Sequence, residues 1–296
     1  MRLAIAIAFA LAASLAVAAA PAAAESADVH RFKIGALDAV SVRDGGLNVA
    51  IDGKTFGIGR PAGEVGQVLT AANLATEAVD LSIQPLLVRG AGKVLLFDTG
   101  AGNVSWAKGG RLQASLSAAG VTPDQVTDIF ISHSHGDHIG GLLGADGALA
   151  FPKATVHLSE PEWASMQAAR LQKPLVAALT PKVVTFKPGA VVLPGLVTAV
   201  AVNGHTAGHS AYEIGTGKAR VLFIGDTAHH FVISVRKPDW TISYDGDAPT
   251  AQASRRALLQ RAADQKLRLY SPHFPFPGVG SVRAEGDGFV WVPEAR

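Results

Sequence analysis

The stretch that decides the fold is Ser132-His133-Ser134-His135-Gly136-Asp137-His138-Ile139-Gly140-Gly141. It follows a short apolar segment, Asp128 to Ser132, whose composition is typical of a buried strand. In an extended chain alternate residues point to the same side, so His133 and His135 can face one position. Asp137 and His138 lie in the turn that follows and can face a second position close by. The stretch thus supplies four potential metal ligands from one strand end.

Two ligand sets on one rigid segment are what a dinuclear metal site requires. The alternative is a polar loop that is rich in histidine by chance. With ten His among 296 residues, so tight a cluster is improbable. The chain has no Cys, which excludes thiolate ligands and thiol nucleophiles. Any metal must therefore be held by histidines and carboxylates.

This His-x-His-x-Asp-His pattern resembles the signature of the metallo-β-lactamase superfamily, and three later segments match that family in the same order. These segments are Gly204-His205-Thr206-Ala207-Gly208-His209, Phe223-Ile224-Gly225-Asp226 and Ser271-Pro272-His273. The resemblance extends from Ile34 to the C-terminus. It implies an α/β fold, an αββα sandwich of two mixed β-sheets flanked by helices.

The resemblance also implies a ligand set. The ligands of the first metal would be His133, His135 and His209. Those of the second would be Asp137, His138 and His273, with Asp226 bridging the two ions. Asp98 would support the site from a strand end, and His205 would either do the same or be an ordinary loop residue. Two divalent ions are implied, with zinc expected, although manganese, cobalt and iron accept the same ligands.

A metal pair of this kind lowers the pKa of a bridging water, so that a hydroxide nucleophile exists near neutral pH. The resemblance therefore implies a metal-dependent hydrolase in which Asp137, Asp226 and His229 are the catalytic residues. His229 or His230, which follow Asp226 closely, could donate a hydrogen bond to the leaving oxygen where lactonases use a tyrosine. The alternative for both histidines is simple packing beside the site.

Local features favour the branch of the family that contains lactonases and methyl parathion hydrolase. True β-lactamases generally lack a bridging carboxylate such as Asp226, and the short tail after His273 leaves no room for a glyoxalase-like helical domain. The segments Asp98 to Ala101 and Pro272 to Gly280 resemble the methyl parathion hydrolase branch. The implied substrates are small lactones, aryl esters or phosphotriesters. The alternatives are β-lactam hydrolysis, an iron-dependent sulfur dioxygenase and a non-catalytic binding protein.

Aromatic residues are candidate walls of a substrate pocket suited to an acyl chain or an aryl leaving group. The four candidates are Trp106, Trp163, Phe231 and Phe274. For each of them the alternative is core packing. Trp240 and Tyr244 are weaker candidates for a lid loop.

The first residues resemble a secretory signal. Arg2 precedes an apolar, Ala-rich run, and Ala22 and Ala24 form a small-residue cleavage site. We therefore predict a signal peptide over residues 1–24 and one hydrolase domain over residues 25–296, periplasmic or secreted. An uncleaved membrane anchor is the alternative, although the run is at the short limit for spanning a bilayer.

The charge of the chain bears on its partners. The formal net charge is only +2, and there is no run of Lys or Arg. Nucleic acid is therefore not an expected partner, and neither is stable membrane association after cleavage. A homodimer is expected from the family resemblance alone.

Overall fold

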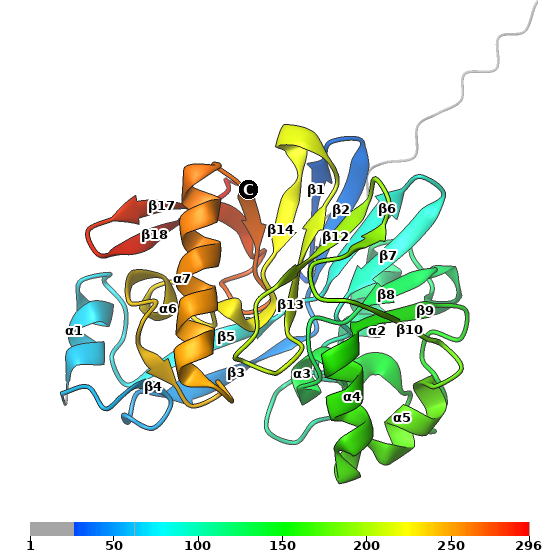
Figure 1. The fold of residues 1–296 in the computed structure, drawn as a ribbon, viewed down its shortest axis with the longest axis horizontal. Helices are drawn as coiled ribbons and strands as arrows, with labels where there is room; N and C mark the ends of the chain where they lie inside the picture. Colours follow the sequence, from blue (N-terminus) through cyan, green and yellow to red (C-terminus); the bar gives the residue numbers. More distant parts are fainter. Residues whose placement is uncertain (1–26, 62, 296) are drawn as a thin grey trace, which may run out of the picture.

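The computed structural model describes residues 27–61 and 63–295. The predicted signal peptide, residues 1–24, lies outside the described residues and stays a prediction. The described chain forms two seven-stranded sheets, two small two-stranded sheets and seven α-helices (Figure 1). Among these described residues, no helix is long and apolar enough to cross a membrane.

Each large sheet combines parallel and antiparallel neighbours, as the mixed-sheet prediction requires. In order across the sheet, the first contains β1 (Val29–Ile34), β2 (Leu37–Val42), β6 (Leu86–Gly90), β7 (Lys93–Phe97), β8 (Asp128–Phe130), β9 (Thr155–Ser159) and β10 (Val183–Phe186). The second contains β11 (Val191–Leu193), β12 (Val197–Ala201), β13 (Ser210–Ile214), β14 (Val221–Phe223), β16 (Arg268–Tyr270), β17 (Val279–Glu285) and β18 (Gly288–Pro293).

The two sheets pack face to face over an apolar layer. Leu86 and Val88 of the first sheet share this layer with Tyr212 and Phe223 of the second, and all four are buried. Side chains alternate between the faces of a strand, so the residues between them, such as Leu87, point the other way. Each sheet is therefore apolar on both faces and needs helices on its outer side.

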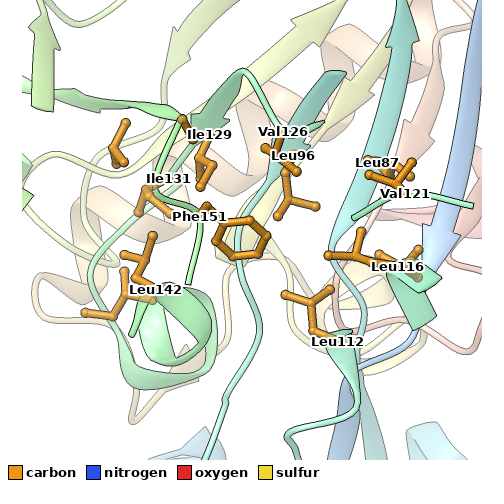
Figure 2. Close-up of a cluster of buried hydrophobic side chains, with 14 of the residues drawn as sticks. Leu87, Leu96, Leu112, Leu116, Val121, Val126, Ile129, Ile131, Leu142 and Phe151 are labelled. Carbon is orange, nitrogen blue, oxygen red and sulfur yellow. The ribbon is translucent and has the colours of Figure 1, made fainter. Parts of the chain in front are cut away.

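Helices cover both outer faces. On the first sheet these are α2 (Leu112–Ala118), α4 (Glu160–Ala168) and α5 (Lys173–Leu179), and on the second α7 (Ala248–Asp264). Figure 2 shows the first of these layers, where Leu112 and Leu116 of α2 meet Leu87 and Leu96 of the sheet. The predicted αββα sandwich is confirmed.

The small sheets and short helices lie on the edge where the large strands deliver the candidate ligands. The pairs are β3 (Gly45–Ala50) with β5 (Ala78–Ile83), and β4 (Phe56–Ile58) with β15 (Thr241–Ile242). The short helices are α1 (Glu64–Thr70), α3 (Gly136–Ile139) and α6 (Ile233–Arg236). Phe56, Leu69 and Trp240 are buried among these elements in an apolar cluster of their own. Trp240 is therefore a core residue and not part of a lid.

Candidate metal centre

Strand ends from both large sheets converge on one site. The strands β8, β14 and β16 end at Phe130, Phe223 and Tyr270, and three candidate ligands, His133, Asp226 and His273, follow each end by three residues. Close backbone approach is needed here. Gly225 has φ +49°, and a Cβ on it would lie 2.5 Å from His209 Nε2, so no larger residue fits without a shift.

A first group of ligand atoms comprises nitrogens of His133, His135 and His205 with a carboxylate oxygen of Asp226, all within 4.8 Å of one another. His205 Nε2 lies 3.1 Å from His133 Nε2 and 2.9 Å from His135 Nδ1. The His133 Nε2 to His135 Nδ1 distance is 3.0 Å. Three imidazole nitrogens therefore point at a common position.

A second group comprises Asp137, His138 and His273, also within 4.8 Å. His273 Nε2 lies 3.3 Å from His138 Nε2 and 3.5 Å from Asp137 Oδ2. The other ring nitrogen of His273, Nδ1, lies 2.7 Å from the carbonyl oxygen of Ser82, a contact that fixes Nδ1 as the donor and leaves Nε2 as an acceptor.

Asp226 lies between the two groups and divides its oxygens between them. Oδ2 lies 3.3 Å from His205 Nε2 and 3.7 Å from His133 Nε2. Oδ1 lies 2.9 Å from His273 Nε2 and 3.1 Å from His138 Nε2. Oδ1 is buried and takes no hydrogen bond within the described part of the chain. One carboxylate facing two ligand sets is the arrangement of a bridging ligand.

The structure corrects the sequence-based assignment of His209. Its Nδ1 lies 3.1 Å from the carbonyl oxygen of Val202, and its Nε2 accepts a hydrogen bond of 3.0 Å from the backbone N–H of Asp226. Both ring nitrogens are therefore used by the protein, and none is left for a metal. His205, expected only to support the site, takes the place among the ligand atoms that was assigned to His209.

Asp98 supports the site as expected. It has φ +59° at the end of β7, and its Oδ2 lies 2.7 Å from His138 Nδ1, so the Nε2 of that imidazole faces the second group. Its Oδ1 accepts the backbone N–H of Ser132 at 2.7 Å. This carboxylate–histidine contact sets the tautomer and the orientation of a ligand.

The electrostatics of the cluster also fit a cation. Burial would lower the pKa of His138, but the carboxylates of Asp226, Asp137 and Asp98 outweigh it and hold that pKa well above its usual value. Burial, together with the neighbouring His138, holds the pKa of His133 well below its usual value. Imidazole nitrogens and carboxylate oxygens converging in a buried site are the donor set that zinc and similar divalent ions prefer.

A cavity of about 400 Å³ opens onto both groups. Its apolar walls are Leu47, Leu81 and Trp106, and Tyr244 and His229 line another part of it. The prediction that Trp106 lines the pocket agrees with this cavity. Leu47 and Leu81 come from the β3–β5 pair and were not predicted.

The other three predicted pocket aromatics are wrong. Trp163 packs against the helix-covered core of the first sheet. Phe231 and Phe274 belong to the core beside α7, where Phe274 is fully buried with its ring edge-on to Trp291. Phe231 and Phe274 lie near ligands in sequence, but all three aromatic side chains pack into a core.

The two histidines after Asp226 have different surroundings. His230 Nδ1 accepts the backbone N–H groups of Val232 and Ile233 at the start of α6, and burial lowers its pKa to about 4. It is a structural residue. His229 lines the cavity with its Nε2 3.2 Å from Asp226 Oδ2, and neither ring nitrogen has a hydrogen-bond partner in the described chain.

The fold and this cluster define a metal-dependent hydrolase. Residues 80–273 match the metallo-beta-lactamase superfamily. The chain therefore belongs to the metallo-β-lactamase superfamily, which confirms the resemblance seen in the sequence.

Solved structures agree with this membership. The chain is similar to AidC, a dizinc quorum-quenching lactonase in complex with a product, at 30% identity and a TM-score of 0.85, covering 90% of this chain and 98% of that one. It is also similar to the hydrolase AbOPH of the beta lactamase superfamily, at 28% identity and a TM-score of 0.82, covering 92% and 99%. A probable metal-dependent hydrolase from Staphylococcus aureus, at 18% identity, a TM-score of 0.75 and coverage of 90% and 99%, shares the fold.

One curated relative is similar over a short segment. A stretch of 66 residues is 38% identical to ribonuclease Z of Methanothermobacter thermautotrophicus. The match covers 22% of this chain and 19% of that protein. It supports the shared family and does not extend to the rest of ribonuclease Z.

Proposed function

We propose that this protein is an exported dinuclear metal hydrolase that opens small lactones, with related aryl esters and phosphotriesters as further substrates. The observation that carries the proposal is Asp226, whose two oxygens face two separate ligand groups at the floor of an apolar cavity. Two divalent cations held there would polarise the substrate carbonyl and lower the pKa of a water molecule.

The cavity favours a substrate with one polar and one apolar end. Leu47, Leu81 and Trp106 form an apolar side on which an acyl chain can lie, and the ligand groups form the polar end. AidC, a relative with 30% identity over nearly its whole length, is described as a lactonase. An acylated lactone therefore suits both the shape of the site and this relative.

Lactone opening adds one water across the ester C–O bond. The hydroxyl adds to the carbonyl carbon, and the ring oxygen leaves and takes a proton. Asp137 and Asp226 hold the acceptor atoms that orient this water. His229 and Tyr244 are the polar side chains on the opposite part of the cavity. Burial raises the pKa of Tyr244, which keeps its hydroxyl protonated.

The proposal is tested by metal content together with turnover. We expect about two divalent ions per chain, with turnover of N-hexanoyl-homoserine lactone that a chelator abolishes and added zinc restores. The panel also contains a p-nitrophenyl ester, a methyl phosphotriester and nitrocefin. Faster turnover of nitrocefin than of the lactone would replace the proposal with a β-lactamase. A single iron without hydrolysis would indicate the sulfur dioxygenase alternative.

We expect His229→Ala to lower kcat on substrates with poor leaving groups, such as alkyl lactones, about 100-fold, which is the usual size of a general-acid contribution. It should change kcat on p-nitrophenyl esters little, because that leaving group needs no proton. Tyr244→Phe is the matched comparison, because it removes the other candidate donor of the cavity. If His229→Ala lowers kcat equally on both kinds of substrate, His229 is a packing residue and not the proton donor.

A further inference from the structure

Arg255 is a fully buried arginine in the middle of α7. Its guanidinium donates hydrogen bonds to the carbonyl oxygens of Thr227 at 2.7 Å, Pro238 at 2.8 Å and Trp240 at 3.3 Å. The remaining donor, Nη2, lies 2.6 Å from Asp245 Oδ2. Burying a charged group is costly unless it is paired and hydrogen-bonded, so this position needs an explanation.

Asp245 connects Arg255 to the metal centre. Its side chain is fully buried, and its Oδ1 lies 3.1 Å from His205 Nδ1. The carboxylate makes Nδ1 the donor of that imidazole and leaves the Nε2 lone pair directed at the first ligand group. Arg255 compensates the buried charge of Asp245, so this contact can persist away from water.

The same guanidinium also contacts the residue that follows the bridging ligand. Thr227, whose carbonyl oxygen accepts from Arg255 Nε, directly follows Asp226. Arg255 is thus linked to His205 through a side chain and to Asp226 through the backbone. Among the described residues, Arg255 donates no hydrogen bond to Asp137, His138 or His273.

A stabilising role alone does not account for this arrangement, because a buried ion pair contributes little net stability compared with well-packed apolar residues. We propose that Arg255 is a positioning residue for the first metal position, acting through Asp245 on His205 and through Thr227 on Asp226. The inference rests on the proposed function only in requiring that the two ligand groups each hold a metal.

The test measures metal affinity and needs no substrate. Zinc is titrated against a chromophoric chelator into Arg255→Met, with Arg256→Met as the matched control. Arg256 is the next residue of the same helix, but it pairs at the surface with Asp239. We expect Arg255→Met to weaken one of the two zinc ions about 10–100-fold, the usual effect of removing a group that orients a ligand, and Arg256→Met to weaken neither.

Two backgrounds identify which ion is affected. In His273→Ala, which damages the second group, Arg255→Met should weaken the remaining zinc about 10–100-fold. In His135→Ala, which damages the first group, Arg255→Met should weaken the remaining zinc much less, because only the shared ligand Asp226 links Arg255 to the second group. Equal weakening in both backgrounds, or in neither, would overturn the positioning role.

A conservative variant keeps the test valid if Arg255→Met does not fold. Arg255→Lys retains the charge beside Asp245 but has no planar fork to hold Thr227 and Pro238. We expect Arg255→Lys to bind the first zinc with an affinity between those of wild type and Asp245→Asn. If Arg255→Lys and Asp245→Asn both bind the first zinc as tightly as wild type, the inference is refuted. If wild-type protein binds no zinc, both the proposed function and this inference are refuted. If wild type binds two zinc ions but Arg255→Met weakens both ions equally, or neither, only the inference is refuted.

Discussion

Asp226→Ala is expected to lose at least one metal ion per chain and to lower kcat/KM at least about 1000-fold, equivalent to about 4 kcal/mol of transition-state stabilisation. The reason is geometric. Asp226 Oδ1 lies beside His273 and His138, and Oδ2 lies beside His205 and His133, so a single truncation removes an acceptor from both ligand groups. Elemental analysis of metal content, with steady-state kinetics on the substrate that turns over best, measures both effects.

A control separates loss of the site from loss of the fold. In the metal-free protein the Asp226 carboxylate lies beside buried histidines and helps to hold the pKa of His138 well above its usual value, so its removal is expected to lower the stability of the fold as well. Asp226→Ala is therefore expected to unfold cooperatively in excess chelator, at a midpoint below that of wild type, which shows that the variant still folds. Asp124→Ala, at an exposed aspartate, should retain full metal content and activity. Normal metal content and turnover in Asp226→Ala would refute the bridging assignment.

The sequence predicted the parts of the site that lie in local patterns. His133, His135, Asp137 and His138 follow one strand within six residues, and this short connection places them together whatever the rest of the chain does. Asp226 and His273 were predicted because each follows a buried strand of the family pattern. Their convergence depends on the pairing of β14 with β16, which the structure shows to be parallel.

The choice between His205 and His209 could not be made from the sequence. Both lie in one Gly-rich segment, and no local signal ranks them. The decision depends on tertiary partners, because Val202 and the backbone of Asp226 take the two nitrogens of His209, while Asp245 orients His205. Asp245 and Arg255 were not predicted either, since a lone Asp in a loop and an Arg in a helix resemble surface residues.

Secondary structure differed from prediction where a polar or Pro residue interrupts an apolar run. The apolar composition of Leu81 to Val88 predicts one buried strand, but this segment forms the end of β5 and the start of β6, which lie in different sheets. Pro85 has no N–H to donate to a neighbouring strand. The side-chain amide of Gln84 donates hydrogen bonds to the carbonyl oxygens of Ser271 and Phe274. The break is what brings Leu81 to the cavity.

The C-terminal hairpin was not predicted. Strands β17 and β18 extend the second sheet, and Val282 and Phe289 are buried in the core beside α7. From the sequence, only a short tail is expected after His273, in a segment that contains Gly278 and Gly286. The glycines do form turns, with φ of +78° and +60°, but the second of them joins two strands.

The largest effect on stability is expected for Glu162→Gln. Glu162 is a buried carboxylate of α4 that takes four hydrogen bonds: Oε1 accepts from the backbone N–H and the hydroxyl of Ser134, and Oε2 accepts from the Thr206 hydroxyl and the Gly208 N–H. Ser134 lies between His133 and His135, and Thr206 follows His205. Glu162 therefore clamps the two loops that carry the first ligand group.

In Glu162→Gln the amide NH₂ replaces one of these oxygens and faces two donors, so two buried hydrogen bonds to a charged acceptor are lost. Each such bond is worth about 1.5–3 kcal/mol, so we expect the free energy of unfolding to fall by about 3 kcal/mol or more. Chemical denaturation of the metal-free proteins measures this, and Glu160→Gln is the control. Glu160 begins the same helix but is exposed, so its variant should match wild type.

The metal dependence of this variant tests the clamp itself. If Glu162 holds the two ligand loops in register, added zinc should stabilise Glu162→Gln less than it stabilises wild type, because part of the binding free energy is used to reorder the loops. An equal increase in the free energy of unfolding for both proteins would mean that the loops are positioned without Glu162. Its buried hydrogen bonds would then contribute to folding and not to the metal centre.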